Sequence, residues 1–205
     1  VGPPPRLRCV NPMRPETPTR ARRLQAGVTA LELAIVTAIG ATLVAAAAPD
    51  FSGFVANAQL RSASENLRSG LRLAQIEAIK RQAPVELVLT DDEPGSASVR
   101  PASDGRNWVI RAPSPGGGYE LLQSLAGAAQ TPRVRVEADR SVFAFDPFGR
   151  LRADSYGNAA PSGDLRVDLA DRDARGRPLR VVVRPTGSSL NCDPGARGGD
   201  PFGCS

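Results

Sequence analysis

The chain lacks histidine altogether, and its 205 residues include only three cysteines and one methionine. Histidine is the commonest general base and a frequent metal ligand, so its absence excludes the most frequent designs of hydrolytic and metal-dependent sites. Cys192 and Cys204 would need histidine or carboxylate ligands to complete a zinc site. The phosphate-binding patterns GxxxxGK[ST] and GxGxxG are also missing. We therefore expect neither a metal nor another cofactor, and a protein that is not an enzyme.

The two C-terminal cysteines lie in the segment NCDPGARGGDPFGCS, which is rich in turn-forming residues and poor in residues that can be buried. A disulfide between Cys192 and Cys204 would close this loop and leave only Cys9 unpaired. Such a bond requires an oxidising compartment, for example the periplasm. The alternative is that both are free thiols.

The positive charge of the chain is confined to its N-terminal segment. Residues 1–27 contain six arginines and one acid, so they carry the whole net charge of +5, and the remaining residues are neutral. This segment is rich in proline and shows no apolar periodicity. We interpret residues 1–27 as a basic leader peptide that is cleaved; translation from Met13 would leave a leader of about fifteen residues.

Residues 28–48 (VTALELAIVTAIGATLVAAAA) are almost purely apolar. A helix of this length spans a bilayer core of roughly 30 Å, so the segment is predicted to cross a membrane. The arginines before it place its N-terminal side in the cytoplasm and residues after Pro49 in the periplasm. A cleaved secretory signal is the alternative, but such signals have shorter apolar cores without an acid. Glu32 is the exception here: it is either a functional charge or one that snorkels to the headgroups.

A helical pattern continues over residues 49–82 but becomes amphipathic. Its apolar stripe consists of Phe51, Phe54, Val55, Ala58, Leu67, Leu71, Ala74 and Ala78. Pro49 is expected to kink one long helix without ending it, because a proline removes a single backbone hydrogen bond. Ala83-Pro84 is the predicted end of the helix.

Residues 83–205 alternate between apolar and polar residues and contain many turn signals, which predicts a β-rich periplasmic domain. Strands are expected at residues 85–89, 108–110, 134–136, 142–146, 165–169 and 179–183. An antiparallel sheet packed on the amphipathic half of the helix would bury both apolar faces. The predicted class is therefore α+β, with a long N-terminal helix.

The run QAGVTALELAIVTAIGATLVAAAAPDF resembles the class III signal of type IV pilins and pseudopilins. Gly27 precedes the cut, Val28 is the first mature residue, Glu32 is the fifth and Pro49 the twenty-second. Val28 stands where the family usually has Phe, and Ala30-Leu31 departs from the commoner Leu-Ile.

Residues 67–89 (LRSGLRLAQIEAIKRQAPVELVL) resemble the GspH/FimT family within this class. The motifs GRNWV at 105–109 and FDPFGR at 145–150 are similar to its Trp strand and its glycine turn. Each motif also has a purely structural interpretation. Glu77 and Lys80 would pair on any exposed helix, Trp108 suits a core, and Gly149 suits a tight turn.

The resemblance implies a structural subunit that primes or tips a type IV pilus or a type II secretion pseudopilus. A prepilin peptidase would cut between Gly27 and Val28, and the new amine would be N-methylated. Glu32 of one subunit would then pair with the Val28 amine of its neighbour, so that the filament satisfies a buried charge. The implied partners are the prepilin peptidase, other major and minor pilins or pseudopilins, and the inner-membrane assembly platform. The subunit would cross the inner membrane once.

DNA uptake is the alternative function, because some FimT-like pilins bind DNA through a Gly-Arg-x-Arg motif. Both arginines are missing after Gly187 in this chain, and the mature part is neutral, so nucleic acid is not an expected partner. The best remaining basic cluster, Arg172, Arg175, Arg177 and Arg180, is interrupted by Asp171 and Asp173. The sequence leaves open whether the chain serves a pilus or a secretion machine.

Overall fold

A computed structural model describes residues 2, 28–196 and 200–204, and it leaves the side chains of residues 46–50 undescribed. The chain divides into two units, residues 1–44 and 45–205, which are described separately below. One helix, α1 (Ala30–Arg81), contributes its first turns to the first unit and the rest to the second. Its backbone is helical at Pro49, so that proline does not end the helix. The predicted kink falls among the residues whose side chains are not described.

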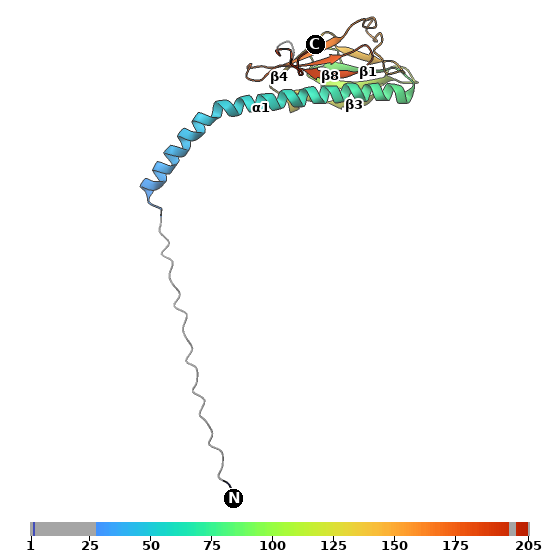
Figure 1. Cartoon of the computed structure of the whole chain (residues 1–205). Coiled ribbons are helices and arrows are strands. Elements are labelled where there is room, and N and C mark those ends of the chain that lie inside the picture. Colours follow the sequence, from blue (N-terminus) through green and yellow to red (C-terminus); the bar gives the residue numbers. More distant parts are fainter. Residues whose placement is uncertain (1, 3–27, 197–199, 205) are drawn as a thin grey trace. The chain divides into compact units, whose positions relative to one another are not determined.

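After α1, the described residues of the second unit form eight strands and one short helix (Figure 1). They are β1 (Val85–Thr90), β2 (Asn107–Pro113), β3 (Tyr119–Leu125), α2 (Gly127–Gln130), β4 (Val134–Ala138), β5 (Val142–Phe145), β6 (Leu165–Asp171), β7 (Leu179–Val183) and β8 (Ser189–Cys192). The six predicted strands are all present. The strands β3 and β8 and the helix α2 were not predicted.

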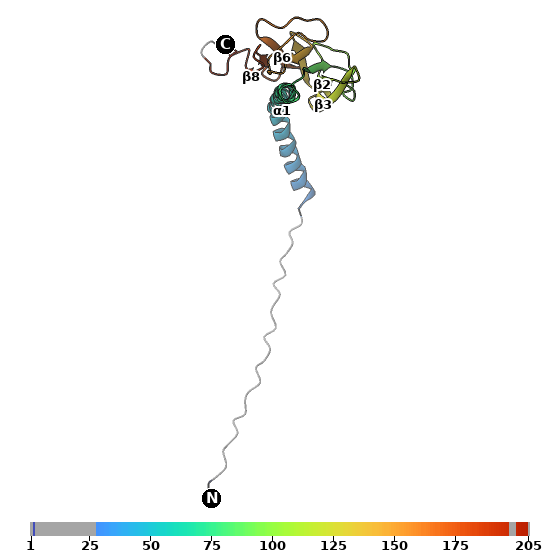
Figure 2. The ribbon, with the colours of Figure 1, turned by 90° about the vertical axis from the view of Figure 1, so that its right-hand side faces the viewer.

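The strands form two antiparallel sheets of four strands each. The first sheet has the order β3-β2-β1-β5, and the second has the order β4-β6-β7-β8. Figure 2 looks along the later part of α1, with β8 on one side of the helix, β2 and β3 on the other, and β6 above it. The structure therefore confirms the α+β class and the antiparallel pairing, but it contains two sheets where one was expected.

One core joins the helix to both sheets. Its buried side chains come from α1 (for example Leu60 and Leu71), from the first sheet (Leu87 and Phe143) and from the second sheet (Val167). The buried positions of α1 follow a helical spacing, and the buried positions of β6 alternate with more exposed ones. The two periodicities thus direct apolar side chains to a common centre.

The opposite face of the first sheet is also covered, because loops lie over it. Arg111 and Glu86 are register partners on β2 and β1, and their side chains form a buried ion pair, with 2.9 Å between Nη2 and Oε2. Arg111 also donates to the Ala97 carbonyl and the Ser155 hydroxyl, both at 3.1 Å, and its guanidinium lies 4.0 Å from the centre of the Tyr119 ring. One buried cation therefore holds two loops on this face.

Burial alone would lower the pKa of Arg111. Its interactions with Tyr156 and Glu86 outweigh that effect and hold the pKa above its usual value. The guanidinium therefore stays charged, and a buried charge of this kind is tolerated only because its hydrogen bonds are satisfied.

At Gly70 the helix α1 packs closely against the first sheet. A Cβ atom at this position would lie 2.9 Å from Cζ2 of Trp108, which is itself buried and therefore not free to move aside. A Cβ at Gly53, on the same helix, would meet nothing closer than 3.7 Å.

Gly70→Ala is expected to lower the free energy of unfolding by about 1 kcal/mol. Overpacking destabilises the fold by roughly 1–3 kcal/mol, whereas the higher helix propensity of alanine stabilises it by about 1 kcal/mol. The matched variant Gly53→Ala is expected to raise it by up to about 1 kcal/mol, through propensity alone. Urea unfolding of the full chain in detergent measures both. Equal effects of the two substitutions would contradict the close packing on Trp108.

Candidate assembly site

The helix α1 begins at Ala30, immediately after two residues without regular structure, Val28 and Thr29. The hydroxyl oxygen of Thr29 accepts a hydrogen bond from the backbone N–H of Glu32 at 3.2 Å. Thr29-Ala-Leu-Glu32 therefore has the sequence of a capping box, in which a threonine satisfies a backbone N–H of the first turn. A carboxylate in this turn is also stabilised by the helix dipole. The T-x-x-E pattern is visible in the sequence and could have predicted this cap.

Glu32 is the only charged residue among residues 28–45, and every side chain of this stretch is exposed. The large exposed apolar side chains are Val28, Leu31, Leu33, Ile35, Val36, Ile39, Leu43 and Val44. Thr37 and Thr42 turn their hydroxyls back to helical carbonyls, with contacts of 2.9 Å to Leu33 and 2.7 Å to Ile39. Because both hydroxyls bond to carbonyls of the same helix, the surface is largely apolar at these two threonines as well.

In the part of the chain whose side chains are described, no helix is long and apolar enough to cross a membrane. Residues 46–48 of the predicted membrane segment, and Pro49, lie outside that part. Gly27 and Cys9 also lie outside the described residues. Cleavage after Gly27 therefore stays a prediction.

The C-terminal loop is closed by a disulfide between Cys192 and Cys204, whose Cα atoms are 5.0 Å apart. This confirms the predicted bond. The N–H of Asp193 donates to the carbonyl of Phe202 at 2.7 Å, and the Asp193 carboxylate lies 3.3 Å from the Arg177 guanidinium. The loop is thus tied to the end of β8 by covalent and backbone contacts, and an ion pair joins its first residues to the segment before β7.

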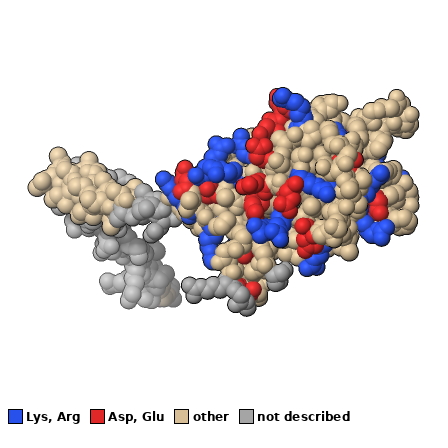
Figure 3. Space-filling view, turned by 90° about the horizontal axis from the view of Figure 1, so that it is seen from above, with Lys and Arg blue, Asp and Glu red and all other residues tan. Residues whose placement is uncertain are grey.

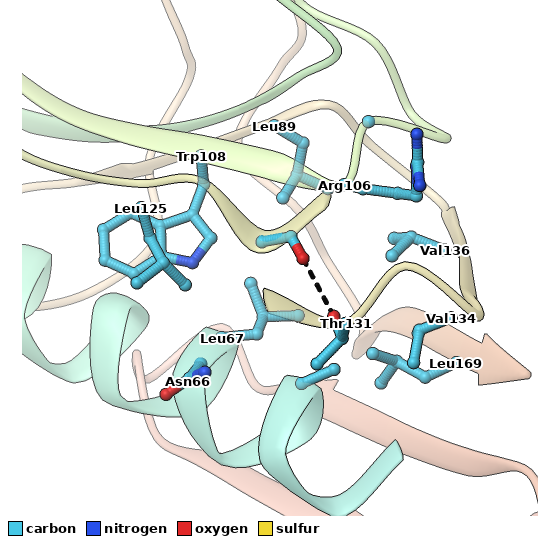
Figure 4. Close-up of a pocket in the computed structure, with 13 residues that line it drawn as sticks. Asn66, Leu67, Leu89, Arg106, Trp108, Leu125, Thr131, Val134, Val136 and Leu169 are labelled. Atoms are coloured by element: carbon cyan, nitrogen blue, oxygen red, sulfur yellow. Dashed lines mark hydrogen bonds between the residues drawn. The ribbon is translucent and has the colours of Figure 1, made fainter. Parts of the chain in front are cut away.

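The motifs of the globular unit have structural roles. Trp108 is buried beside a cavity of about 30 Å³, enough for about one water molecule, between α1, β2 and the second sheet (Figure 4). Gly149 has a φ of +78°, and the Asp146 carboxylate accepts N–H bonds from Phe148 and Arg150, both at 2.9 Å. Gln75 of α1 donates to the Gly149 carbonyl at 2.8 Å, so this turn is fixed to the helix.

The end of α1 carries a small charge network. Glu77 lies 2.9 Å from Arg81 and 3.2 Å from Lys80. Hydrogen bonds from Arg81 first, and from Lys80 second, hold the pKa of Glu77 below its usual value. Arg81 also pairs with Glu120 of β3. The predicted pair of Glu77 and Lys80 is therefore present, and its role is to fasten the helix end.

Two of the four arginines in the basic cluster, Arg177 and Arg180, are paired with acids. Arg180 forms two hydrogen bonds with Asp168, at 2.6 and 2.8 Å, and Arg177 pairs with Asp193. On the face shown in Figure 3, acidic and basic side chains are interspersed. This mixture gives no specific support to the DNA-binding alternative, which needs a continuous basic surface.

The family model described as Type II transport protein GspH matches residues 63–187. A similar solved structure is the type IV minor pilin FimU of Pseudomonas aeruginosa, with 16% identity, coverage of 67% of this chain and 90% of that chain, and a TM-score of 0.48. GspH of E. coli has 16% identity, covers 72% and 95%, and has a TM-score of 0.45. A search of curated proteins finds no significant match.

The minor pseudopilin EpsH from the type 2 secretion system of Vibrio cholerae has 10% identity, covers 67% and 99%, and has a TM-score of 0.46. The family match carries the assignment, because it spans more than half of the chain, from the amphipathic part of α1 to Gly187. This is a pilin-like protein of the GspH/FimT type with a structural, minor-pilin role. The chain belongs to the GspH family.

Reduction of the Cys192–Cys204 bond is expected to lower the free energy of unfolding by about 3 kcal/mol at most, because the bridge constrains a short loop in the unfolded chain. Urea unfolding with and without reductant measures the change, and the double variant Cys192→Ser/Cys204→Ser serves as the control, because reductant should not alter its stability. Two alkylatable thiols at Cys192 and Cys204 in protein isolated from the periplasmic side would contradict the bridge.

Proposed function

We propose that this protein is a minor pilin or pseudopilin that enters a filament through the N-terminal part of α1 after cleavage between Gly27 and Val28. The observation that carries the proposal is an apolar, exposed helix surface over residues 28–45, whose single charge, Glu32, lies one turn from the future N-terminus. An exposed apolar surface of this kind requires a membrane or other subunits around it.

Cleavage would create an α-amine on Val28, four residues before Glu32. Thr29 binds the backbone N–H of Glu32, and among the described residues no hydrogen bond or ion pair engages the Glu32 carboxylate. The carboxylate is therefore available to the amine of a neighbouring subunit. An unpaired acid in hydrocarbon costs at least ~2.5–3.5 kcal/mol, so pairing between subunits would favour assembly over the isolated state.

The environment follows from the same features. The arginine-rich leader favours a cytoplasmic N-terminus, and the disulfide favours a periplasmic globular unit. The protein would cross the inner membrane once, be processed by the prepilin peptidase, and be assembled on the inner-membrane platform beside other major and minor pilins. The disulfide loop would lie on the periplasmic side, where it can contact another subunit.

Gly27→Glu is expected to leave an uncut precursor, because the peptidase subsite accepts a small residue before the scissile bond. The control Gln25→Glu adds the same charge two residues earlier and should be processed normally. Intact-mass spectrometry of the membrane fraction distinguishes the two. A normal mature N-terminus at Val28 in the Gly27→Glu protein would disprove the signal assignment.

Glu32→Gln separates assembly from capping, because glutamine still suits a capping box but carries no charge. If pairing with the neighbour's amine drives assembly, incorporation into filaments should fall at least tenfold, which corresponds to about 1.4 kcal/mol. Membrane insertion should persist, since the helix becomes less polar.

The control Thr29→Val removes the cap and keeps the charge, so it should weaken the helix start by about 1 kcal/mol and leave assembly largely intact. Quantitative immunoblots of sheared filaments measure incorporation. If the Glu32→Gln protein is incorporated into filaments as well as the parental protein, the carboxylate contributes to helix capping only and not to assembly.

A further inference from the structure

A groove of about 820 Å³ lies between α1, the strand β8 and the C-terminal disulfide loop. One wall is the part of α1 from Phe54 to Glu65, and the other contains Asn191 of β8 and Phe202 of the disulfide loop. The N–H of Arg177 donates to the side-chain oxygen of Asn57 at 2.8 Å, which fastens the sheet to the helix here. The groove therefore has two walls that are fixed relative to each other.

The strand β8 is an edge strand, because it pairs only with β7 in the sheet order. Its pairing pattern can be followed from the β7–β8 turn, where the Arg184 N–H donates to the Ser188 carbonyl at 2.9 Å. In an antiparallel pair, opposed residues alternate between hydrogen-bonded and non-hydrogen-bonded pairs. Leu190 and Cys192 are therefore hydrogen-bonded to Val182 and Arg180 across the ladder. The N–H and C=O of Asn191 consequently point away from β7, towards the free edge.

Ser189 supports this assignment, because its carbonyl accepts a hydrogen bond from Arg68 of α1 at 3.2 Å. The sheet edge is thus occupied by the Arg68 side chain at the Ser189 carbonyl and by the Phe202 carbonyl at the Asp193 N–H. Between these two contacts, the backbone groups of Asn191 face the free edge. An open strand edge is a template for a further strand.

The side chain of Asn191 also contains a polar atom without a hydrogen-bond partner among the described residues. Its Nδ2 donates to the Ser64 hydroxyl at 3.3 Å, whereas its Oδ1 is buried and has no hydrogen-bond partner among the described residues. Buried polar atoms without partners are rare in folded proteins and each needs an explanation. Because this oxygen is enclosed, a ligand in the groove would donate a hydrogen bond to it only after the Asn191 side chain turns towards the groove.

The remaining lining indicates the chemistry of that ligand. Phe54 and Phe202 stand on opposite walls and are 71% and 75% exposed, which suits apolar side chains between them. The charged lining residues carry both signs, and Arg177 is already paired with Asp193. A polyanion such as DNA is therefore not favoured, whereas a polypeptide offers alternating N–H and C=O groups together with apolar side chains.

We propose that this groove binds an extended segment of a neighbouring pilin-like subunit, which adds a strand to the β8 edge at Asn191. The proposal rests on the filament role proposed above and names the contact by which the globular units join. The disulfide fixes the Phe202 wall next to β8, so it shapes the groove as well as stabilising the loop.

The test replaces Phe202 by the photo-crosslinking analogue benzoylphenylalanine in the full chain, in cells that assemble filaments. Phe148 is the matched control, because it is also a phenylalanine, is 80% exposed and lies on the turn fixed to Gln75. Mass spectrometry identifies the linked peptide. We expect at least tenfold more crosslinking from position 202 than from 148, to an extended segment of another pilin-like subunit.

Asn191→Pro then tests strand pairing, because it removes the outward N–H without removing a bond to β7. It should reduce crosslinking from position 202 at least tenfold, while Asn191→Ala, which keeps the N–H, should reduce it less. Hydrogen exchange of the Asn191 amide in the parental protein provides an independent measurement: filaments should protect it, and the free chain in detergent should not.

The outcomes separate the two proposals. A chain absent from filaments overturns the filament role and the groove contact together. Incorporation with equal crosslinking at positions 148 and 202, with crosslinks only to proteins that are not pilin-like, or with an unprotected Asn191 amide overturns the groove contact alone.

Discussion

The packing of α1 against two sheets at once is the contact on which the rest of the globular unit depends. Leu60, Leu71 and their neighbours on the helix meet side chains of both sheets in a single core, and Gly70 allows the helix backbone to approach Trp108. Each sheet has four strands and would expose an apolar face without the helix. The helix is therefore the shared partner that brings the two sheets together, and a substitution at one of its core positions, such as Leu60 or Leu71, affects both. Phe51 and Phe54, which were expected on the same apolar stripe, are exposed.

The outer face of the first sheet is organised differently, around a charge. Arg111 and Glu86 are buried there, and their satisfied hydrogen bonds hold the loops at Ala97 and Ser155 against the sheet. Breaking one partner would leave an uncompensated buried charge, which is strongly destabilising, whereas the intact pair adds little net stability. The main effect of this ion pair is therefore to position the two loops, and its contribution to the stability of the fold is smaller.

The two proposed contacts with other subunits lie on one helix but use different physical chemistry. The N-terminal part offers an apolar surface with a single carboxylate, so it suits partners that exclude water and bring one positive charge. The groove beside β8 offers hydrogen-bonding groups of the backbone and of Asn191, so it suits a partner with a defined chain direction and register. The first contact would serve any filament subunit, and the second would select a neighbour.

The sequence by itself determined the elements with strong periodicity: the long helix, six strands, the α+β class and the disulfide between the two C-terminal cysteines. It did not reveal β3 or β8, because YELLQSL lacks a clear alternation and SLNC is too short to show one. The capping box at Thr29 and Glu32 was readable in the sequence and was missed. Only the tertiary structure decided that there are two sheets, that Arg111 meets Glu86, and that Asn191 is left with an unpaired oxygen. Those features depend on strand order and register, which bring together residues far apart in the chain, and local periodicity contains no information about such distances.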